Sequence, residues 1–325
     1  MIRRITAGVL SVFLLLVFIM NSTAMAASVN GNGLRVSPVR TDLIIYPGHS
    51  STVKMYVTNE TKTSVTLEPI VNNFVASGQT GSPALILKDP NAPDPNGLRQ
   101  FIAPLKKVTL LPNQVSVVNV VINIPKDISG GGYYGAIRFT PIQNKFSKGV
   151  SIIASVASII LVKVPGPQLH DQLNLSSFAV SQNNQASSFF FTGKGLVLIT
   201  KFQNIGNVQS VPFGKVSVQN MFGRVIMTKA INSVSPPGNV LPSSIRAFSV
   251  PLSHISSFGK YTVSGNFGYG SKGQLLSATT TFYVVAPWII GLIVLVLLAI
   301  ITLLWFMPKI FRAWYRRSLK RGKSQ

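Results

Sequence analysis

One stretch near the C-terminus constrains this chain more than any other feature. Residues 286–306 contain no charged side chain, and Trp288 and Trp305 lie near the two ends of the run. A helix of roughly 20 apolar residues crosses the hydrocarbon core of a bilayer, which is about 30 Å thick. Tryptophan rings favour the headgroup layers on either side of that core. The run therefore predicts one transmembrane helix at 286–306.

The residues that flank the chain's two apolar ends predict its orientation. Segment 307–325 is rich in Lys and Arg and contains no acid, so the positive-inside rule predicts a cytoplasmic tail and an extracellular remainder. Arg3 and Arg4 precede an apolar run at 5–20 and small residues at 24–26, the order of a secretory signal. We predict a signal peptide at 1–26, with an uncleaved anchor as the alternative, and a single-pass protein of the cell membrane.

The exported part is about 260 residues long, enough for two domains with their own cores. The chain has no cysteine, so its stability must come from burial and not from disulfides. Its basic residues are scattered singly, which argues against nucleic acid as a partner. Spread positive charge suits an anionic polymer outside the cell, or serves solubility alone. No acid follows Asp171, so we expect the two halves to have different partners.

Short strand-like segments dominate the exported part. Segment 53–59 alternates apolar and polar residues with period two, and Gly, Pro and Asn turns recur about every ten residues. Segment 78–97 is dense in Gly, Pro, Asp and Asn and predicts a long loop. We predict an all-β fold: two tandem immunoglobulin-like β-sandwiches at 34–164 and 168–283, followed by the C-terminal transmembrane helix.

The two predicted domains share a local pattern. Segments 110–134 and 240–261 each contain a Pro-led turn, a strand, a Gly turn and a tyrosine that opens the next strand. This arrangement is typical of the tyrosine corner of immunoglobulin-like sandwiches, whose hydroxyl caps a nearby loop. Asn59 and Asn204 also end strands in equivalent turns.

No pattern of catalytic or metal-binding residues stands out. The three histidines lie far apart, the Ser-x-x-Lys matches at 51–54 and 257–260 lack companion motifs, and no nucleophile elbow or phosphate loop occurs. Segment 89–97 offers oxygen donors, but it lacks the closing Glu of a calcium loop and contains three prolines, so a rigid solvated loop is favoured. We predict that the protein is not an enzyme and binds no cofactor or metal.

The glycine-rich run at 130–139 is the most informative motif. Its glycines allow close backbone approach, and its adjacent tyrosines could stack on sugar or peptide. The candidate binding residues are Tyr133, Tyr134 and Arg138. In the alternative reading, the tyrosines serve only the turn and the corner.

This run, together with four shorter motifs, resembles the WxL-interacting proteins of Gram-positive cell surfaces. The shorter motifs are Val36-Ser37-Pro38, Pro47-Gly48, Leu111-Pro112-Asn113 and Ile124-Pro125. Domain order and anchoring match over nearly the whole chain, whereas the detailed similarity is confined to the first domain. The resemblance implies a first domain that binds peptidoglycan and a second that holds partners carrying a WxL domain. The second domain departs from the family in its lack of acids, and no binding residue is carried over.

The main functional hypothesis is a non-catalytic surface protein that links the cell wall to another protein. Its expected partners are wall polymer (peptidoglycan or an anionic glycan), a secreted or surface protein of possible WxL type, and membrane lipid around the helix, but no nucleic acid. The first domain would face the wall through 78–97 and the strand from Tyr133 to Arg138. The alternative is a stalk, or a chaperone-like sandwich that assembles exported subunits by strand addition. Strand addition requires an exposed, unpaired sheet edge.

Overall fold

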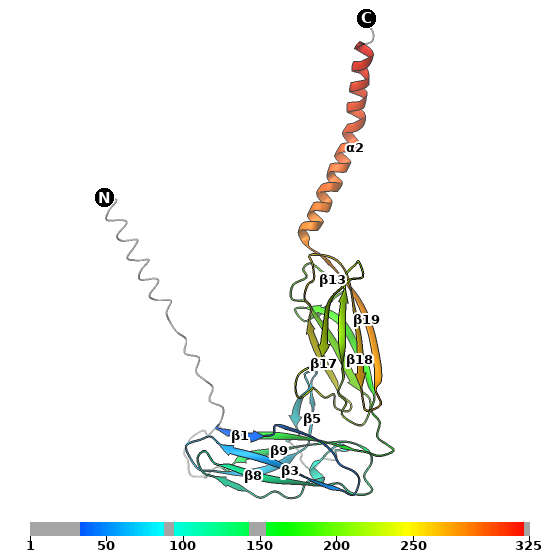
Figure 1. The fold of residues 1–325 in the computed structure, drawn as a ribbon. Helices are drawn as coiled ribbons and strands as arrows, with labels where there is room; N and C mark the ends of the chain where they lie inside the picture. The colour runs from blue at the N-terminus through cyan, green and yellow to red at the C-terminus, as the bar shows by residue number, and fades with distance from the viewer. Residues whose placement is uncertain (1–32, 88–93, 143–153, 322–325) are drawn as a thin grey trace, which may run out of the picture.

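The computed structural model describes residues 33–87, 94–142 and 154–321. It contains two β-sandwiches and one long C-terminal helix, which confirms the predicted fold class (Figure 1). The first sandwich lies across one end of the second, and the helix leaves from the opposite end. The predicted signal peptide at 1–26 lies outside the described residues, as do positions 88–93 of the predicted loop.

The first sandwich packs a three-stranded sheet against a five-stranded sheet. The three-stranded sheet, in spatial order, contains β1 (Leu34–Ser37), β3 (Ser50–Asn59) and β8 (Val115–Asn123). The five-stranded sheet contains β2 (Arg40–Ile44), β10 (Val156–Val164), β9 (Gly131–Pro141), β4 (Val65–Asn72) and β7 (Val108–Leu110). The chain passes from one sheet to the other between β1 and β2, where Pro38 interrupts the strand. A 3-10 turn, η1 (Arg99–Phe101), precedes β7.

The second sandwich packs a four-stranded sheet against a five-stranded sheet. The four-stranded sheet contains β12 (Gln185–Ala186), β11 (Leu173–Gln182), β14 (Val197–Asn204) and β17 (Ile245–Pro251). The five-stranded sheet contains β13 (Phe189–Phe190), β19 (Gln274–Val285), β18 (Phe258–Tyr269), β15 (Phe213–Gln219) and β16 (Val225–Ile231).

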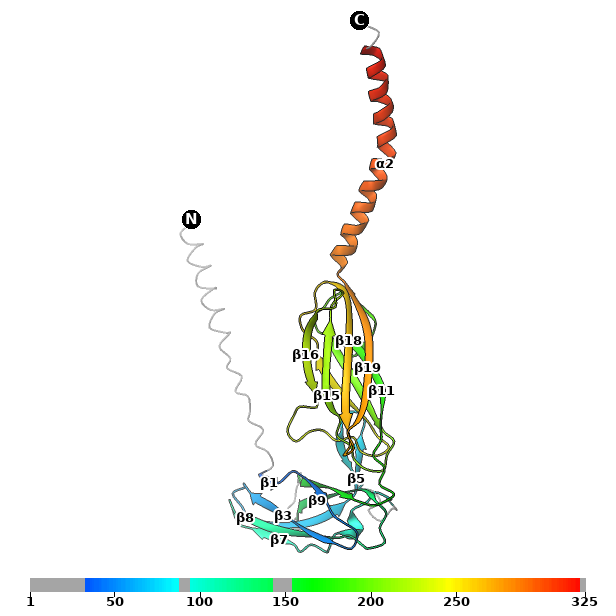
Figure 2. The same ribbon diagram turned by 45° about the vertical axis from the view of Figure 1, so that its right-hand side comes forward.

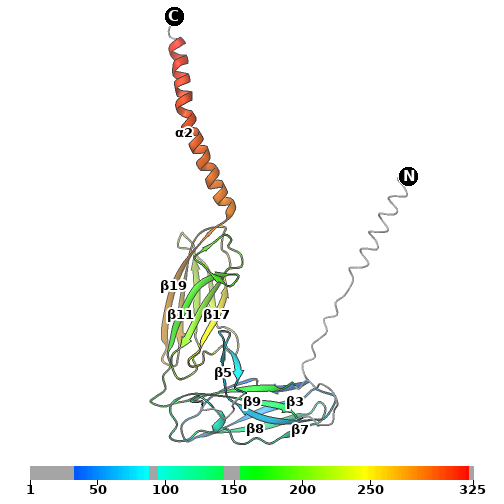
Figure 3. The same cartoon turned by 180° about the vertical axis from the view of Figure 1, so that it is seen from behind.

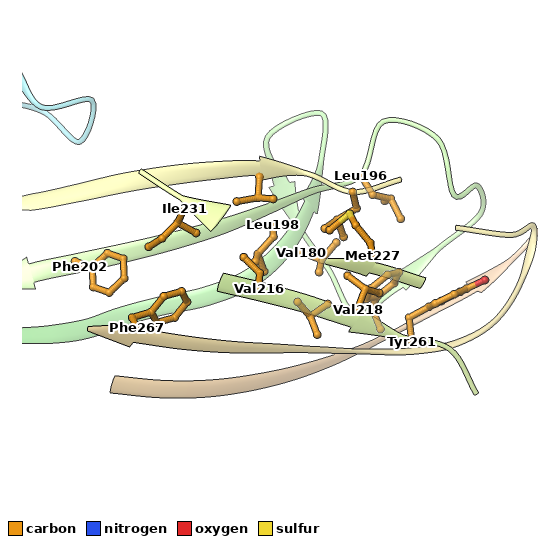
Figure 4. Close-up of a cluster of buried hydrophobic side chains, with 14 of the residues drawn as sticks. Val180, Leu196, Leu198, Phe202, Val216, Val218, Met227, Ile231, Tyr261 and Phe267 are labelled. Carbon is orange, nitrogen blue, oxygen red and sulfur yellow. The ribbon is translucent and has the colours of Figure 1, made fainter. Parts of the chain in front are cut away.

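Each sandwich has its own apolar core, built from the inward-facing positions of its strands. In β14 every second residue is buried, as period-two patterning requires. The core of the second sandwich runs from Phe202 and Phe267 at one end to Met227 and Tyr261 at the other (Figure 4). The rings of Phe202 and Phe267 meet edge to face, with centroids 5.2 Å apart. Because the chain has no disulfide, this burial carries its stability, at about 1.5–3 kcal/mol for each large apolar side chain.

The asparagine turns predicted from the sequence are present in both sandwiches. The buried amide of Asn59 donates to the carbonyls of Thr63, Leu110 and Leu111, and its oxygen accepts from the N–H of Thr61. The amide of Asn204 likewise donates to the carbonyls of Val208 and Val240 and accepts from the N–H of Gly206. Each asparagine therefore ties the end of one strand to a Pro-led turn far along the chain.

The predicted tyrosine corners are confirmed as well. The Tyr133 hydroxyl donates to the Ser129 carbonyl at 2.8 Å, and the Tyr261 hydroxyl accepts from the Ser256 N–H at 2.9 Å. Both rings are buried. The repeated pattern in the sequence thus corresponds to two copies of one structural device.

The two sandwiches meet at an elbow. Asn207 of the second sandwich accepts from the Gly132 N–H through its carbonyl, and its side-chain amide donates to the Gly130 carbonyl. Leu241 packs against an apolar cluster on the outer face of the first sandwich, formed by Phe74, Tyr134, Ala136 and Leu161. The segment that joins the domains is packed too, because a Cβ on Gly130 would lie only 2.9 Å from the Cα of Gly166.

The prediction of one long loop at 78–97 is wrong for its first part. Residues 74–85 form a β-hairpin of β5 (Phe74–Ser77) and β6 (Ser82–Leu85), which projects from the first sandwich to the second (Figures 1 and 3). At the hairpin tip, the Gln79 carbonyl accepts from the Ala247 N–H of β17 at 2.8 Å. The glycines and Pro83 suggested a loop, whereas Gly78 and Gly81 supply the positive-φ turn of the hairpin.

The C-terminal helix α2 spans Pro287–Arg321. Its first part, Pro287–Lys309, is long and apolar enough to cross a membrane and is not buried by the protein. The Lys309 ammonium lies over the Trp305 ring, 3.4 Å from its centroid, at the end of the apolar segment. The predicted span ended at Phe306, but the helix continues through the basic residues that follow.

Candidate functional site: the open edge of the second sandwich

An edge strand presents unpaired N–H and C=O groups that can bind another chain, and proteins usually guard such edges. In the first sandwich, β1 and β7 are only four and three residues long. β2 carries Arg40 and Asp42, which form an ion pair at 2.8 Å. β8 is covered in its second half, because the Ala103 N–H donates to the Val121 carbonyl. Each edge is therefore short, charged or partly covered.

Two edges of the second sandwich are guarded by different means. The hairpin tip occupies the Ala247 N–H of β17, and Pro251 at the end of this strand has no N–H to offer. The Pro251 carbonyl accepts from the Lys229 ammonium at 3.0 Å. Lys229 lies on β16, whose pairing with β15 also contains a register shift between Val218 and Gln219. A proline, an edge lysine and a bulge all discourage strand addition.

The edge of β19 has none of these protections over most of its length. β13 pairs with β19 only at Tyr283 and Val284, where the Tyr283 N–H donates to the Ser188 carbonyl at 2.8 Å. The backbone of Tyr283 therefore points away from β18. Pairing with β18 continues without a shift along the whole of β19. Because backbone direction alternates along a strand, the groups of Leu275, Ser277, Thr279 and Thr281 point outward as well. Among the described residues, none supplies a backbone partner for these four.

The sequence of β19 suits an edge that pairs with another chain. From Gln274 to Val285 there is no charged residue and no proline. Three consecutive threonines, 279–281, are followed by aromatic and β-branched residues, all of which favour extended backbone. Leu275, a residue that is 79% exposed, lies at the end of the edge that is farther from the helix.

The surface beside this edge, formed in part by the neighbouring strand β11, is partly apolar. β11 lies beside β19 at the same side of the sandwich, and no backbone pairing joins the two strands (Figures 2 and 3). Phe178 of β11 is half-buried and stacks edge to face on Phe267, with centroids 6.0 Å apart. Leu276 is the cross-strand neighbour of Phe267 and is half-buried too. An added strand could therefore place alternate side chains on apolar surface that is still partly exposed.

The three binding residues predicted from the sequence lie elsewhere. Tyr133 is 5% exposed and serves the tyrosine corner, and burial raises its pKa. Tyr134 is 3% exposed, and its hydroxyl donates to the Gln209 side chain of the second sandwich at 2.9 Å. Burial also raises the pKa of the Tyr134 hydroxyl. Arg138 is half-buried and contacts the Asn72 side chain. In this arrangement neither ring is open to a sugar or peptide, which agrees with the structural reading of the tyrosines.

A hollow of about 350 Å³ lies at the elbow, under the hairpin tip. Its walls come from Gln79 of the hairpin and from small side chains of the outer sheet face, among them Ser177, Ala179 and Ser181. Lys201 is its one charged lining residue. Within the described residues, no group of three or more His, Cys, Asp or Glu side chains could hold a metal.

No family model and no curated protein matches this chain. Several solved structures are similar to it at low identity. A class 5 fimbriae chaperone, CfaA, has 15% identity and a TM-score of 0.37, covering 77% of this chain and 98% of its own. The E. coli chaperone DraB has 14% identity and a TM-score of 0.35, covering 77% and 96%. A Salmonella enterica SafA pilin complex with the SafB chaperone has 13% identity and a TM-score of 0.33, covering 78% and 95%. These identities and TM-scores are too low to carry information on function.

Proposed function

We propose that this chain is a membrane-anchored, non-catalytic binding protein whose second sandwich holds an extended segment of an exported protein by strand addition. The observation that carries the proposal is the edge of β19, where the outward backbone groups of Leu275, Ser277, Thr279 and Thr281 have no described partner. Most other edges are short, charged or partly covered. The edge of β11 is paired with β12 only at Ser181 and Gln182, but its own ladder to β14 is interrupted by a register shift between Leu175 and Ser177. The alternative function from the sequence, the chaperone-like sandwich, thus has the stronger structural support.

Strand addition at this edge would supply affinity through the backbone and selectivity through side chains. Each hydrogen bond of an added strand contributes about 0.5–1.5 kcal/mol net, so a run of them gives useful binding without a deep pocket. β13 already forms such a pairing with Tyr283 and Val284, in parallel orientation. A bound segment would extend this short pairing toward Leu275 and place side chains near Phe178 and Leu276.

The anchor determines where such a partner would be held. In this proposal α2 crosses the cell membrane with its basic end in the cytoplasm, so both sandwiches face outward. β19 runs directly into α2, which places one end of the open edge at the bilayer and the other farther out (Figure 1). Partners would be secreted or surface proteins, as the resemblance to the WxL-interacting proteins also implies.

Site-specific photo-crosslinking in intact cells tests the proposal. A crosslinking residue at Ser277 or Thr279 is expected to capture the same exported partner, while one at Thr228 on the guarded β16 edge captures none. Thr279→Pro removes one outward N–H without touching the ladder to β18, and is expected to reduce capture at Ser277 several-fold. Thr279→Val keeps that N–H and the shape of the side chain, so capture should persist. Undiminished capture in the proline variant would sink the proposal.

Binding of wall polymer by the first sandwich stays a prediction from the sequence. It is tested separately by sedimenting the full-length chain in detergent with purified cell wall. The predicted result is co-sedimentation that weakens with salt, because Lys and Arg would supply the contacts. A chain that remains in the supernatant at low salt would remove wall binding and leave the proposal for β19 untouched.

A further inference from the structure

The second sandwich is joined to the helix by a single residue. β19 ends at Val285, α2 begins at Pro287, and Ala286 between them is buried. The Ala286 N–H donates to the Ser257 carbonyl at 2.9 Å, and its own carbonyl accepts from the Ile289 N–H in the first helical turn. The joint is therefore held on both sides. No flexible linker separates the sandwich from the start of the helix.

Three segments surround this joint, and we name them the membrane-proximal rim: 189–194, 220–225 and 254–260. The first lies beside the end of β19, because Phe189 and Phe190 pair with Tyr283 and Val284. The second connects β15 to β16, and the third leads into β18, whose Phe258 lies opposite Val285. Figure 1 shows these loops around the start of α2.

The rim exposes more large apolar side chains than its role as a set of turns requires. Phe222 is 85% exposed, and Phe189, Phe191, Met221 and Phe258 are exposed as well. Phe189 and Phe191 meet edge to face, with centroids 5.4 Å apart. Between the second and third segments lies a hollow of about 90 Å³, lined in part by Met221, Phe222 and Phe258. Contiguous exposed apolar surface commonly marks a site of contact with a partner or a membrane.

The charge of the rim is entirely positive. Lys194, Arg224 and Lys260 are exposed within its three segments, and the chain contains no acid after Asp171. Aromatic side chains flanked by basic ones are typical of surfaces that lie in the interface of an anionic bilayer. A protein partner could in principle use the same residues. The position of the rim around the start of α2 favours the bilayer over a protein partner, because a protein bound here would have to share the space with the lipid.

We propose that the membrane-proximal rim lies in the lipid headgroup layer, with Phe191, Phe222 and Phe258 inserted at the hydrocarbon boundary. Lys194, Arg224 and Lys260 would bind anionic headgroups around them. The headgroup layer on each side of a bilayer is about 5–8 Å deep, comparable to the height of loops that are fixed to the first turn of the helix. The second sandwich would then stand in a fixed orientation and not swing about Ala286. This inference rests on the membrane anchoring in the proposed function.

Spin labels on single cysteines test this inference, because the chain has no cysteine of its own. The full-length chain is placed in lipid nanodiscs, and collisions of the label with oxygen and with a water-soluble nickel chelate report immersion. A label at Thr192, exposed within the rim, is expected to be shielded from the chelate. A label at Phe213 is the matched control, because Phe213 is 57% exposed at the opposite end of β15. A label at Leu297 within α2 reports the anchoring itself.

Two sets of substitutions then probe the contacts. Phe222→Ser is expected to reduce immersion of the Thr192 label by roughly tenfold, whereas Phe213→Ser leaves it unchanged. Combined substitution of Lys194, Arg224 and Lys260 by Gln should remove the gain in immersion seen on adding phosphatidylglycerol to phosphatidylcholine discs, as should high salt.

The outcomes separate the two proposals. If the Thr192 label is as accessible to the chelate as the Phe213 label while Leu297 is immersed, the rim inference fails and the anchoring stands. If the Leu297 label is itself open to water, the anchoring fails first. Shielding of Thr192 only after addition of an exported protein would make the rim a protein-binding surface and overturn the lipid assignment.

Discussion

The two sandwiches share the same asparagine turns and tyrosine corners, but they differ in how well their edge strands are protected from pairing with another chain. Asn59 and Asn204 tie equivalent turns, and Tyr133 and Tyr261 form equivalent corners. The three ion pairs between described residues all lie in the first sandwich, and each includes a residue on or next to one of its edge strands. They join Arg35 to Glu60, Arg40 to Asp42 and Lys107 to Glu68.

The difference affects the accessibility of the sheet edges more than the stability of the sandwiches. Exposed ion pairs contribute little to stability, commonly 0–1 kcal/mol, so the pairs of the first sandwich matter more as charges that discourage strand addition. The second sandwich has a single acid, Asp171, which takes part in none of these three pairs, and β19 has no charged residue. One scaffold thus occurs twice, once with guarded edges and once with an edge left open.

The largest expected effect concerns the independence of the two cores. Phe139 and Phe202 are both fully buried, in the first and second core respectively. Phe139→Ala and Phe202→Ala are each expected to cost about 3–5 kcal/mol, mostly in the sandwich that carries the change. Hydrogen exchange of the full-length chain in detergent, read peptide by peptide, would show which sandwich loses protection. Equal loss in both sandwiches from either variant would mean that they unfold as one unit.

Next in size is the loss of a turn asparagine. Asn59→Ala and Asn204→Ala each leave buried carbonyls without a donor, and each is expected to destabilise its own sandwich by about 2–3 kcal/mol. Chemical denaturation of the full-length chain measures both. Asn113→Ala is not a suitable control, since Asn113 has positive φ. Asn119→Ala on the exposed face of β8 is a better one and should change little. A loss confined to one of the two variants would break the equivalence of the domains.

Alkaline pH should act on the elbow through Tyr134. Burial raises the pKa of this phenol, so the folded state keeps its proton when the unfolded chain releases it. The contribution to stability is therefore complete below about pH 10, the ordinary pKa of tyrosine. Above this pH it declines by about 1.4 kcal/mol per pH unit. Denaturation midpoints between pH 9 and 11 should fall less steeply in Tyr134→Phe than in the unmodified chain. Identical slopes would contradict the burial of this hydroxyl.

The smallest effect concerns the hairpin that joins the domains. Gly78 and Gly81 both have positive φ, so alanine costs roughly 1 kcal/mol of backbone strain at either position. Only Gly81 lies against another side chain, the half-buried Arg246 guanidinium of the second sandwich. Gly81→Ala is therefore expected to loosen the elbow, and Gly78→Ala serves as the matched control. Distances between spin labels on the two sandwiches should broaden only in the Gly81 variant.

Sequence reasoning reached the architecture because its signals are local. The uncharged run before Lys309, the alternation within each strand and the repeated Asn and Tyr positions each report their own surroundings. The hairpin at 74–85 was missed because its glycines and proline are equally typical of loops, and its docking on β17 depends on contacts far along the chain. Tyr133 and Tyr134 were candidates for binding because the sequence shows neither that Tyr133 faces the core of its own sandwich nor that the second sandwich covers Tyr134.

The open edge could have been noticed, but not assigned, from the sequence. The absence of charge and proline over 274–285 is visible there, but β11 shares both properties over ten residues. Whether a strand lies at an edge or in the middle of a sheet depends on topology. The short pairing of β13 with Tyr283 and Val284, which shows the direction of the backbone, is a feature of the folded chain alone.

The bond from Ala247 to Gln79 has a consequence for how the molecule can be divided. The first sandwich occupies one backbone N–H of β17, so cutting the chain after Val164 would free that group while most of the β19 edge is already unpaired. The resulting fragment would have unpaired backbone groups at two sheet edges, those of β17 and β19, and would tend to pair with copies of itself. The two sandwiches are therefore not independent modules, because the first covers part of one sheet edge of the second.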